Sequence, residues 1–144
     1  MRLVVDANIF VAELIRQRGR VLIARRDFEL FVAEAAWDEA QYELRKRILA
    51  MVNQGKFSLE TGETLLETAF ALAEAKARLI PEAIYAPWKT QALLRIRRDP
   101  DDWPTVALAL AVDAAIWTLD ADFLGCGIAT WTTETLLLID RDEN

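Results

Sequence analysis

Residues 3–10 read LVVDANIF, and this stretch decides the fold that we expect. Leu3 to Val5 is a short, uninterrupted apolar run, which is typical of a strand buried on both faces of a parallel sheet. The run ends at an acid, Asp6, and apolar residues then recur at helical spacing until Gly19 interrupts the pattern. A buried strand that leads directly into a helix predicts a strand–helix–strand unit, the building block of an α/β fold.

The rest of the chain repeats this alternation. Because strands that alternate with helices favour a parallel sheet covered on both faces, we predict one α/β domain over residues 1–144, with three α/β/α layers and a short, doubly wound sheet. Ser58 is the candidate N-cap of one of the helices. Further strands are expected at 29–32, 79–80, 115–119 and 128–131, and helices at 21–23, 35–52, 59–77, 83–97, 105–113 and 133–139.

Composition narrows the class of protein. The 144 residues are 53% hydrophobic and 28% charged, which is typical of a globular chain with a core. The longest apolar run, Val106 to Val112, is far shorter than the ~18 residues of a membrane span, so no membrane partner is expected. The single cysteine, Cys126, cannot form an intramolecular disulfide, which favours a reducing cytoplasm. The chain has no histidine, so a cysteine–histidine nucleophile is excluded.

The net charge of −6 is unevenly distributed along the sequence. Residues 1–98 hold sixteen Lys or Arg and thirteen Asp or Glu, whereas residues 99–144 hold one basic residue, Arg141, and ten acids. The overall charge is therefore a poor guide to partners, because a basic surface and an acidic site can coexist in one chain. A polyanionic partner such as a nucleic acid is not excluded.

Acids occur where expected strands end. Asp6 follows the first strand, and Asp120 follows the strand at 115–119. Asp102 opens the helix that leads into that later strand. Sites in doubly wound folds form beyond the carboxyl ends of the strands, so these three acids are expected on one rim of the sheet. For the aspartates of residues 99–102 the alternative is helix capping, which is worth about 1 kcal/mol.

Carboxylates gathered without histidine or cysteine select a hard cation. Mg²⁺ and Mn²⁺ prefer oxygen ligands, whereas zinc sites are built mainly from nitrogen and sulfur. Such an ion polarises a phosphoryl oxygen and lowers the pKa of a bound water, so that no histidine base is required. The residues therefore predict hydrolysis of a phosphate ester.

Four stretches match a known family in the family's order. They are LVVDANIF (3–10), ELFVAEAAWDEAQYEL (29–44), DPDDWPTVALALAV (99–112) and IWTLDADF (116–123), and together they span nearly the whole chain. In these stretches the chain resembles the PIN-domain endoribonucleases, which include VapC-like toxins and domains of the PilT N-terminus type. The resemblance implies a PIN-like fold and a ribonuclease activity that depends on Mg²⁺ or Mn²⁺.

The resemblance also implies roles for individual residues. Acids at the rim would be catalytic and would bind the metal, and polar neighbours would orient the ligands or a water. The implied set is Asp6, Glu39, Asp102 and Asp120 as catalytic, metal-binding acids, Asp122 as a further metal ligand, and Asn8 and Thr118 as orienting residues.

Two of these alignments stay open. Asp38 or Glu43 could take the place of Glu39. On a helix Asp38 and Glu39 point about 100° apart, so only one of them can face the site. The place of Asp102 could be taken by Asp99 or Asp101.

By resemblance, the substrate is single-stranded or looped RNA. Basic residues around the acidic site would bind its phosphates. An ordinary solvated helix surface is the alternative for each basic run, and Glu43 and Arg47 have the i, i+4 spacing of a surface ion pair. The candidate RNA-binding residues are Arg45, Lys46, Arg95, Arg97 and Arg98, with further basic residues at Arg47 and in the runs at 16–20 and 25–26.

A cognate antitoxin and a homodimer are further partners that the resemblance implies. The main alternative is a catalytically silent PIN-like scaffold or protein-binding module, against which the presence of all four acids argues. Phosphatases and receiver domains are disfavoured because they need a late lysine, and none follows Lys89.

Trp37 and Trp117 are expected in the core, whereas Trp103, beside the acids, either fills the turn or stacks on a base.

Overall fold

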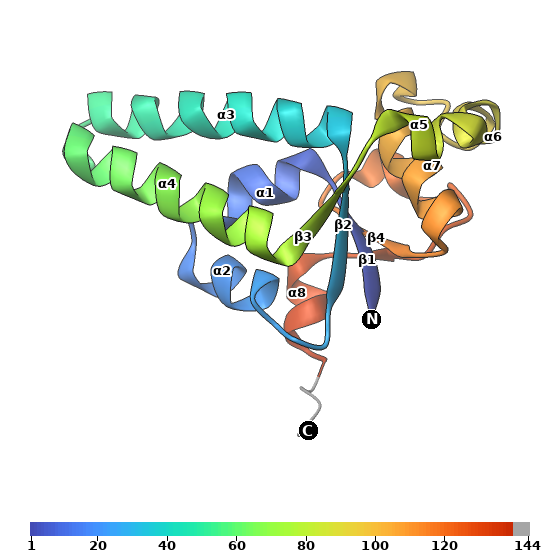
Figure 1. Ribbon diagram of the computed structural model, residues 1–144, viewed down its shortest axis with the longest axis horizontal. Helices are drawn as coiled ribbons and strands as arrows, with labels where there is room; N and C mark the ends of the chain where they lie inside the picture. The colour runs from blue at the N-terminus through green and yellow to red at the C-terminus, as the bar shows by residue number, and fades with distance from the viewer. Residues whose placement is uncertain (140–144) are drawn as a thin grey trace.

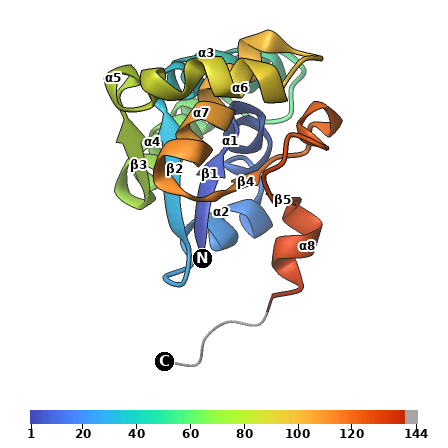
Figure 2. The same cartoon turned by 90° about the vertical axis from the view of Figure 1, so that its right-hand side faces the viewer.

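Strand β1 (Arg2–Val5) lies at the centre of the sheet, as the opening stretch predicts. The structure, a computed structural model, describes residues 1–139. Within that range five strands pair in parallel in the order β3-β2-β1-β4-β5, which can be followed in Figure 2 together with Figure 1. The other strands are β2 (Glu29–Ala33), β3 (Ala77–Ile80), β4 (Ala115–Trp117) and β5 (Thr130–Trp131).

Helices cover both faces of this sheet, which confirms the predicted α/β/α layers. Helix α7 packs on β1 and β2 with α5 and α6 beside it, and α1, α3 and α4 lie on the opposite side (Figures 1 and 2). Helix α8 packs against α2. The helices are α1 (Ala7–Glu13), α2 (Gln17–Ile23), α3 (Glu34–Asn53), α4 (Leu59–Lys76), α5 (Glu82–Tyr85), α6 (Lys89–Arg95), α7 (Trp103–Val112) and α8 (Thr133–Leu137), with short 3-10 turns η1 (Ala86–Trp88), η2 (Pro100–Asp102) and η3 (Ala121–Phe123).

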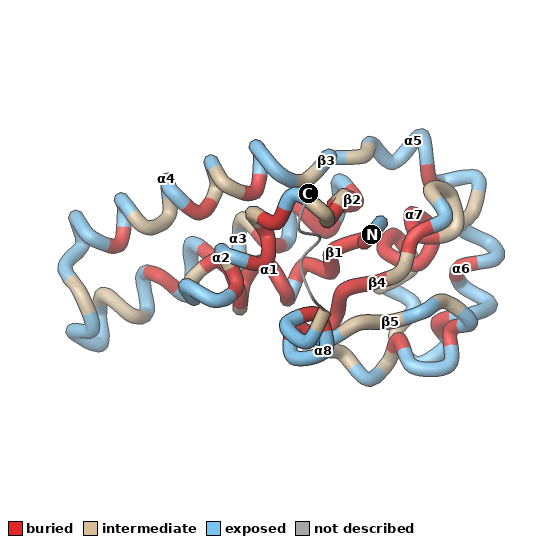
Figure 3. Tube along the Cα trace, turned by 90° about the horizontal axis from the view of Figure 1, so that it is seen from below, coloured by how far each residue is buried: buried red, intermediate tan, exposed pale blue. Residues whose placement is uncertain are grey.

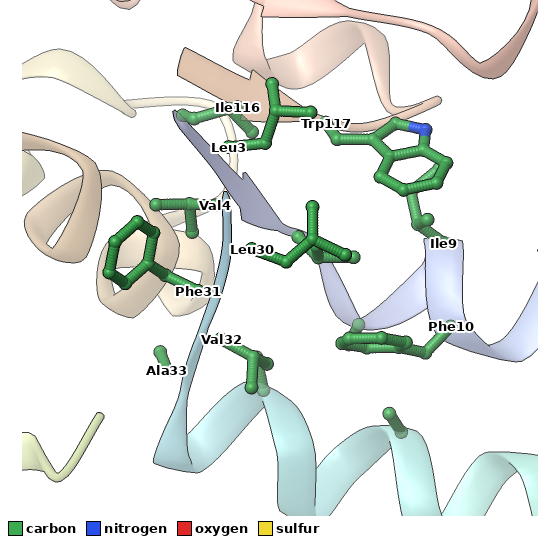
Figure 4. Close-up of a cluster of buried hydrophobic side chains, with 14 of the residues drawn as sticks. Leu3, Val4, Ile9, Phe10, Leu30, Phe31, Val32, Ala33, Ile116 and Trp117 are labelled. Atoms are coloured by element: carbon green, nitrogen blue, oxygen red, sulfur yellow. The ribbon is translucent and has the colours of Figure 1, made fainter. Parts of the chain in front are cut away.

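The core has two apolar layers because the strands are buried on both faces. Figure 4 shows Val4 and Phe31 on one side of the sheet, and Leu30 and Val32 on the side of Phe10. All five side chains are at most 3% exposed. Burial of each such side chain stabilises the fold by about 1.5–3 kcal/mol, so the continuous apolar runs of β1 and β2 hold the two helical layers together.

Helices α3 and α4 form an antiparallel pair that extends beyond the sheet (Figure 1). Gly55, with φ of 76°, supports the turn after α3, and Ser58 caps α4 by accepting from the Thr61 backbone N–H at 3.1 Å. Trp37 of α3 contacts Phe10 and Phe70 edge to face, at 5.4 and 5.8 Å between ring centroids. The pair is therefore anchored near the sheet, while its far end is largely exposed (Figure 3).

The position of Gly19 differs from our expectation. We expected it to interrupt the first helix, but α1 ends at Glu13 and Gly19 lies inside α2. A Cβ at Gly19 would lie 2.2 Å from the backbone oxygen of Glu13. The glycine is thus required for close approach of α1 and α2 rather than for a turn.

Two further expectations on secondary structure are wrong in part. The helix expected at 83–97 is three pieces, α5, η1 and α6, because Pro87 has no backbone N–H to continue an α-helix. The strand expected at 115–119 ends at Trp117, so Asp120 stands three residues beyond it rather than next to it. The expected tryptophan environments hold for Trp37 and Trp117, which are 7% and 0% exposed.

The order of the strands creates one switch point. The chain winds outwards from β1 to β2 and β3 and then returns to the other side of β1 to form β4 and β5. Loops that follow β1 and β4 therefore diverge at adjacent carboxyl ends, which is where doubly wound folds form their sites. Among residues 1–139, no helix has the length and apolar character needed to cross a bilayer.

Candidate carboxylate site

Asp6 sits at this switch point, between the end of β1 and the start of α1. Its side chain is only 5% exposed and makes no capping hydrogen bond to α1, although a hydrogen bond from the Ala7 backbone N–H lowers its pKa. Thr118, just after β4, donates its hydroxyl to Asp6 Oδ2 at 2.9 Å and accepts the Asp120 backbone N–H at 3.0 Å. One threonine hydroxyl therefore ties the ends of β1 and β4 together.

The pKa of Asp6 reflects its surroundings. Burial raises the pKa from its usual 3.8 to about 6, the hydrogen bond from Thr118 works in the opposite direction, and the charges of Asp120 and Glu39 raise it further. These two acids come from α3 and from the segment after β4. Asp6 is thus in electrostatic contact with acids from remote parts of the chain.

Asp102 meets the same acids from the start of α7. It occupies the N-cap position, but its side chain makes no capping hydrogen bond, and its Oδ2 is buried with no partner among the described residues. Burial, followed by the charges of Asp99, Asp6, Asp120 and Glu39, raises its pKa to about 7. A buried carboxylate oxygen without a donor is costly, so this group is unlike an ordinary helix cap.

The geometry bears on the two positions for which the sequence left alternatives, Glu39 and Asp102. Glu39 raises the pKa of both Asp6 and Asp102, whereas Asp38 lines a separate hollow on α3. The capping role near α7 falls to Asp99, which accepts the Asp101 backbone N–H at 3.2 Å. The structure therefore brings Glu39 and Asp102 to the neighbourhood of Asp6, and it gives Asp99 a local structural contact.

The acids of this site, Asp6, Glu39, Asp102 and Asp120, affect one another through their charges but do not form a tight cluster. Within residues 1–139, no three potential ligand side chains approach closely enough to make a ready-made metal cluster. The donor set nevertheless fits a hard divalent cation, because it consists of carboxylate oxygens and includes the unpartnered, buried Oδ2 of Asp102.

Two other predicted residues lie at the border of this site. The Asp122 backbone N–H donates to Asp120 Oδ1 at 2.9 Å, which orients Asp120. The side chain of Asp122 lines a hollow with Arg97 and Arg98 instead of adding to the shifted pKa of Asp6 or Asp102. Asn8 is exposed in the first turn of α1 and lines a groove together with Glu39.

Most arginines of the basic runs have structural partners. Arg25 binds Asp27 through both carboxylate oxygens and lies over Phe28. Arg95 donates to the Cys126 carbonyl at 2.9 Å, in the space that Gly127 leaves free. The runs at 16–20 and 25–26 belong to α2 and the loop after it, which Figure 1 places at the opposite end of the sheet from the start of α3.

The remaining candidates for RNA binding occupy different surfaces. Arg97 and Arg98 are exposed and line the hollow that contains Asp122. Arg45 lies over the ring of Phe70 at 5.2 Å and lines the separate hollow with Asp38. Lys46 lines the groove with Asn8 and Glu39.

This groove, between α1 and α3, contains one basic residue, Lys56, that lies outside the basic runs predicted to bind RNA. It has a volume of about 550 Å³, and Arg47 and Lys56 line it beside Lys46. Residues 39, 43, 46–47, 50 and 54 of its lining recur at helical spacing along α3, and this periodicity was the available signal in the sequence. Lys56 lies beyond the end of α3, so the helical period does not include it. The turn between α3 and α4 brings it to the groove.

Comparison with known families identifies one match. A family model described as PIN domain matches residues 4–140. The comparison with curated proteins gave no match to the chain. The family match covers all four strand-end and helix-start stretches from which the site is built.

Proposed function

The chain belongs to the PIN-domain family, whose general activity is that of a nuclease, and we propose that it is an endoribonuclease dependent on Mg²⁺ or Mn²⁺. Asp6, Glu39, Asp102 and Asp120 are the proposed catalytic acids and metal ligands, with Asp122 as a further ligand. The observation that carries the proposal is the buried Oδ2 of Asp102, which has no hydrogen-bond partner among residues 1–139. Burial and then the charges of Asp99, Asp6, Asp120 and Glu39 raise the pKa of the same carboxyl group.

A bound Mg²⁺ or Mn²⁺ would supply Lewis-acid chemistry, since it polarises a phosphoryl oxygen and lowers the pKa of a bound water. The chain's own residues supply orientation. Thr118 fixes Asp6 Oδ2, and the Asp122 backbone N–H fixes Asp120 Oδ1. Preorganised ligands of this kind reduce the reorganisation that catalysis requires.

The substrate that we propose is single-stranded or looped RNA. Support comes from the family and from the exposed basic residues that line hollows on both sides of the acids, with Lys46 on α3 and Arg97 and Arg98 after α6. We also propose, from the resemblance to VapC-like toxins, that the protein acts in the cytoplasm as the toxin of a toxin–antitoxin pair, as a single domain over residues 1–144 that can form a homodimer.

The cleavage test compares matched acids. Asp6→Asn and Asp120→Asn keep the size of each side chain and an oxygen that can accept the hydrogen bond from Thr118 or Asp122. Asp113→Asn is the control, because Asp113 is an exposed acid after α7 with φ of 52°, a conformation that asparagine tolerates. We expect Mn²⁺-dependent cutting of a 5′-labelled RNA by the wild type and the control alone, with unchanged far-UV circular dichroism in all variants.

Equal cleavage by all four proteins would refute the assignment and indicate a contaminating nuclease. No cleavage by any of them, with every variant folded, would favour the silent scaffold. The toxin proposal is tested separately by inducible expression with and without the adjacent open reading frame. Growth arrest that Asp6→Asn abolishes and the neighbour suppresses is the expected result, and normal growth on expression of the wild type alone would contradict it.

A further inference from the structure

We propose that the groove between α1 and α3 is a binding track for single-stranded RNA, in which Lys46, Arg47 and Lys56 hold the phosphates on one side of the cleaved bond. The inference rests on the proposed nuclease function and deepens it by assigning the path of the substrate. It adds Lys56, selects Lys46 and Arg47 from the basic run at 45–47, and removes Arg45 from the RNA-binding set.

The groove starts at the carboxylate site and leads away from it. Asn8 and Glu39 line its near end, and Gln54 and Lys56 line its far end at the turn between α3 and α4. At ~1.5 Å per residue, the fifteen residues from Glu39 to Gln54 correspond to about 22 Å along the helix axis. An extended strand of several nucleotides fits along this distance with one end at the acids.

The charges change sign along the groove. Glu39 and Glu43 lie toward the acidic site, and Lys46, Arg47 and Lys56 follow toward the far end. None of these three basic residues forms an ion pair within residues 1–139, and the i, i+4 pair of Glu43 with Arg47 is not formed. Cations that have no carboxylate partner are available to bind phosphate.

Ion pairs already occupy a smaller part of the basic surface, at Arg2, Arg18, Arg25 and Arg78. Arg18 approaches Glu134 and Glu13, and Arg2 binds Glu29, so these guanidinium groups are already matched with acids. Arg45 is adjacent to Lys46 in sequence, but it contacts Phe70 and lines only the hollow with Asp38, whereas Lys46 lines both that hollow and the groove. Sequence proximity is therefore a poor guide to which cations face the substrate, and helix geometry decides it.

The floor of the groove indicates how the RNA is recognised. Val11, Ala50 and Met51 line it, and no aromatic side chain does. Base stacking on aromatic rings is therefore missing from this track, and the contacts to phosphate must dominate. Binding is expected to depend little on base sequence and strongly on salt concentration.

Continuity with the acidic site favours RNA over an acidic peptide as the occupant. Glu39 and Glu43 repel the carboxylates of a peptide at the near end. A phosphodiester chain is drawn through the same place because the acids beyond it can hold a divalent cation, which neutralises them. The groove thus delivers a phosphate to the site that would cleave it.

The test measures equilibrium binding, so that it does not depend on cleavage. Full-length Asp120→Asn protein serves as the background, and a fluorescein-labelled single-stranded RNA is titrated by anisotropy at several salt concentrations. For single strands the slope of log K against log salt changes by about 0.7 per phosphate contact, so replacing Lys46, Arg47 and Lys56 together by Gln reduces it by about 2. Between about 50 and 200 mM salt, this difference corresponds to a roughly 20-fold smaller loss of affinity.

Two control variants that each remove a single positive charge complete the design. Lys76→Gln removes an exposed cation at the end of α4, and Arg45→Gln removes one from the neighbouring face of α3. Neither is expected to change the slope. A reduction of about 0.7 on Arg45→Gln, which is the change expected for one groove cation, would show that the overall charge of α3 attracts RNA, and this would overturn the track.

Other outcomes separate the inference from the proposed function. A wild type that cuts RNA, with groove variants that keep the full salt slope, overturns the track alone. A wild type that neither cuts nor binds RNA overturns both. A poly-glutamate peptide is the competing probe, and a loss of its binding in the groove variants without loss of RNA binding would assign the groove to a protein partner and overturn the inference.

Discussion

Replacing Asp6 by Asn should stabilise the protein when divalent ions are absent. The pKa of Asp6 is raised from 3.8 to about 6, first by burial and then by Asp120 and Glu39. At about 1.36 kcal/mol per pKa unit, keeping this carboxylate ionised in the fold costs about 3 kcal/mol well above pH 6. Asparagine has no charge to desolvate, and its oxygen can still accept the hydroxyl of Thr118.

The expected gain in the free energy of unfolding is about 2 kcal/mol, because burial of the amide N–H groups offsets about 1 kcal/mol of the relief. For a domain of this size, the gain corresponds to a rise in Tm of roughly 4–8 °C. A gain of stability on mutation of a buried residue is unusual, since most such changes destabilise.

The pH dependence follows from the direction of the shift. A carboxyl group with a raised pKa in the fold favours folding in its protonated form, so its contribution is fully present below pH 3.8 and is lost as the pH rises through about 6. Near pH 4 the relief of charge is small and the cost of burying the amide N–H groups remains, so Asp6→Asn should be slightly less stable than wild type. The sign should reverse as the pH rises, and the gain should reach a plateau above about pH 7.

The assay is urea denaturation in a chelating buffer at several pH values, with unfolding monitored by circular dichroism. Asp113→Asn, an exposed acid away from the site, is the control and should show no such pH-dependent gain. A loss of stability of Asp6→Asn at about pH 8, or a difference from wild type that is the same at every pH, would refute the electrostatic reasoning.

Three further changes probe the fold around the site. Thr118→Val removes the donor to Asp6 and should lower the free energy of unfolding by about 1–3 kcal/mol. Thr118→Ser keeps the hydroxyl, so urea denaturation should show that it retains most of the wild-type stability. Gly19→Ala places a Cβ 2.2 Å from the oxygen of Glu13 and should destabilise by about 1–3 kcal/mol; an unchanged Tm would show that α1 and α2 can separate freely. Ser58→Ala should cost about 1 kcal/mol through loss of the α4 cap, and an equal cost for Ser58→Gly would argue against a capping role.

The layers of the fold were predictable because burial leaves a direct mark on the sequence. The continuous apolar runs of β1 and β2 and the cap at Ser58 each determine local structure by themselves. Gly19 was misread because a glycine in a turn and a glycine in a close helix contact have the same sequence signal. Pro87 was overlooked within an apolar period that otherwise continues to Ile96.

The candidate site was predictable to the extent that topology alone brings residues together. Parallel strands, with Asp102 at the start of the helix before β4, place Asp6, Asp102 and Asp120 on one rim. Glu39, which the family resemblance supplied, lies close enough to raise the pKa values of Asp6 and Asp102. The unpartnered Asp102 oxygen could not be predicted, because the packing around η2 buries it. The groove beside Lys56 likewise depends on how α1 packs against α3.

The central claim is that side chains from remote segments hold one divalent cation, and calorimetric titration of Mn²⁺ tests it most directly. Wild type and Asp113→Asn should bind Mn²⁺ with equal affinity, whereas Asp6→Asn and Asp120→Asn should each lose about tenfold or more. Unchanged Mn²⁺ affinity in both site variants, with their folds intact, would contradict the account.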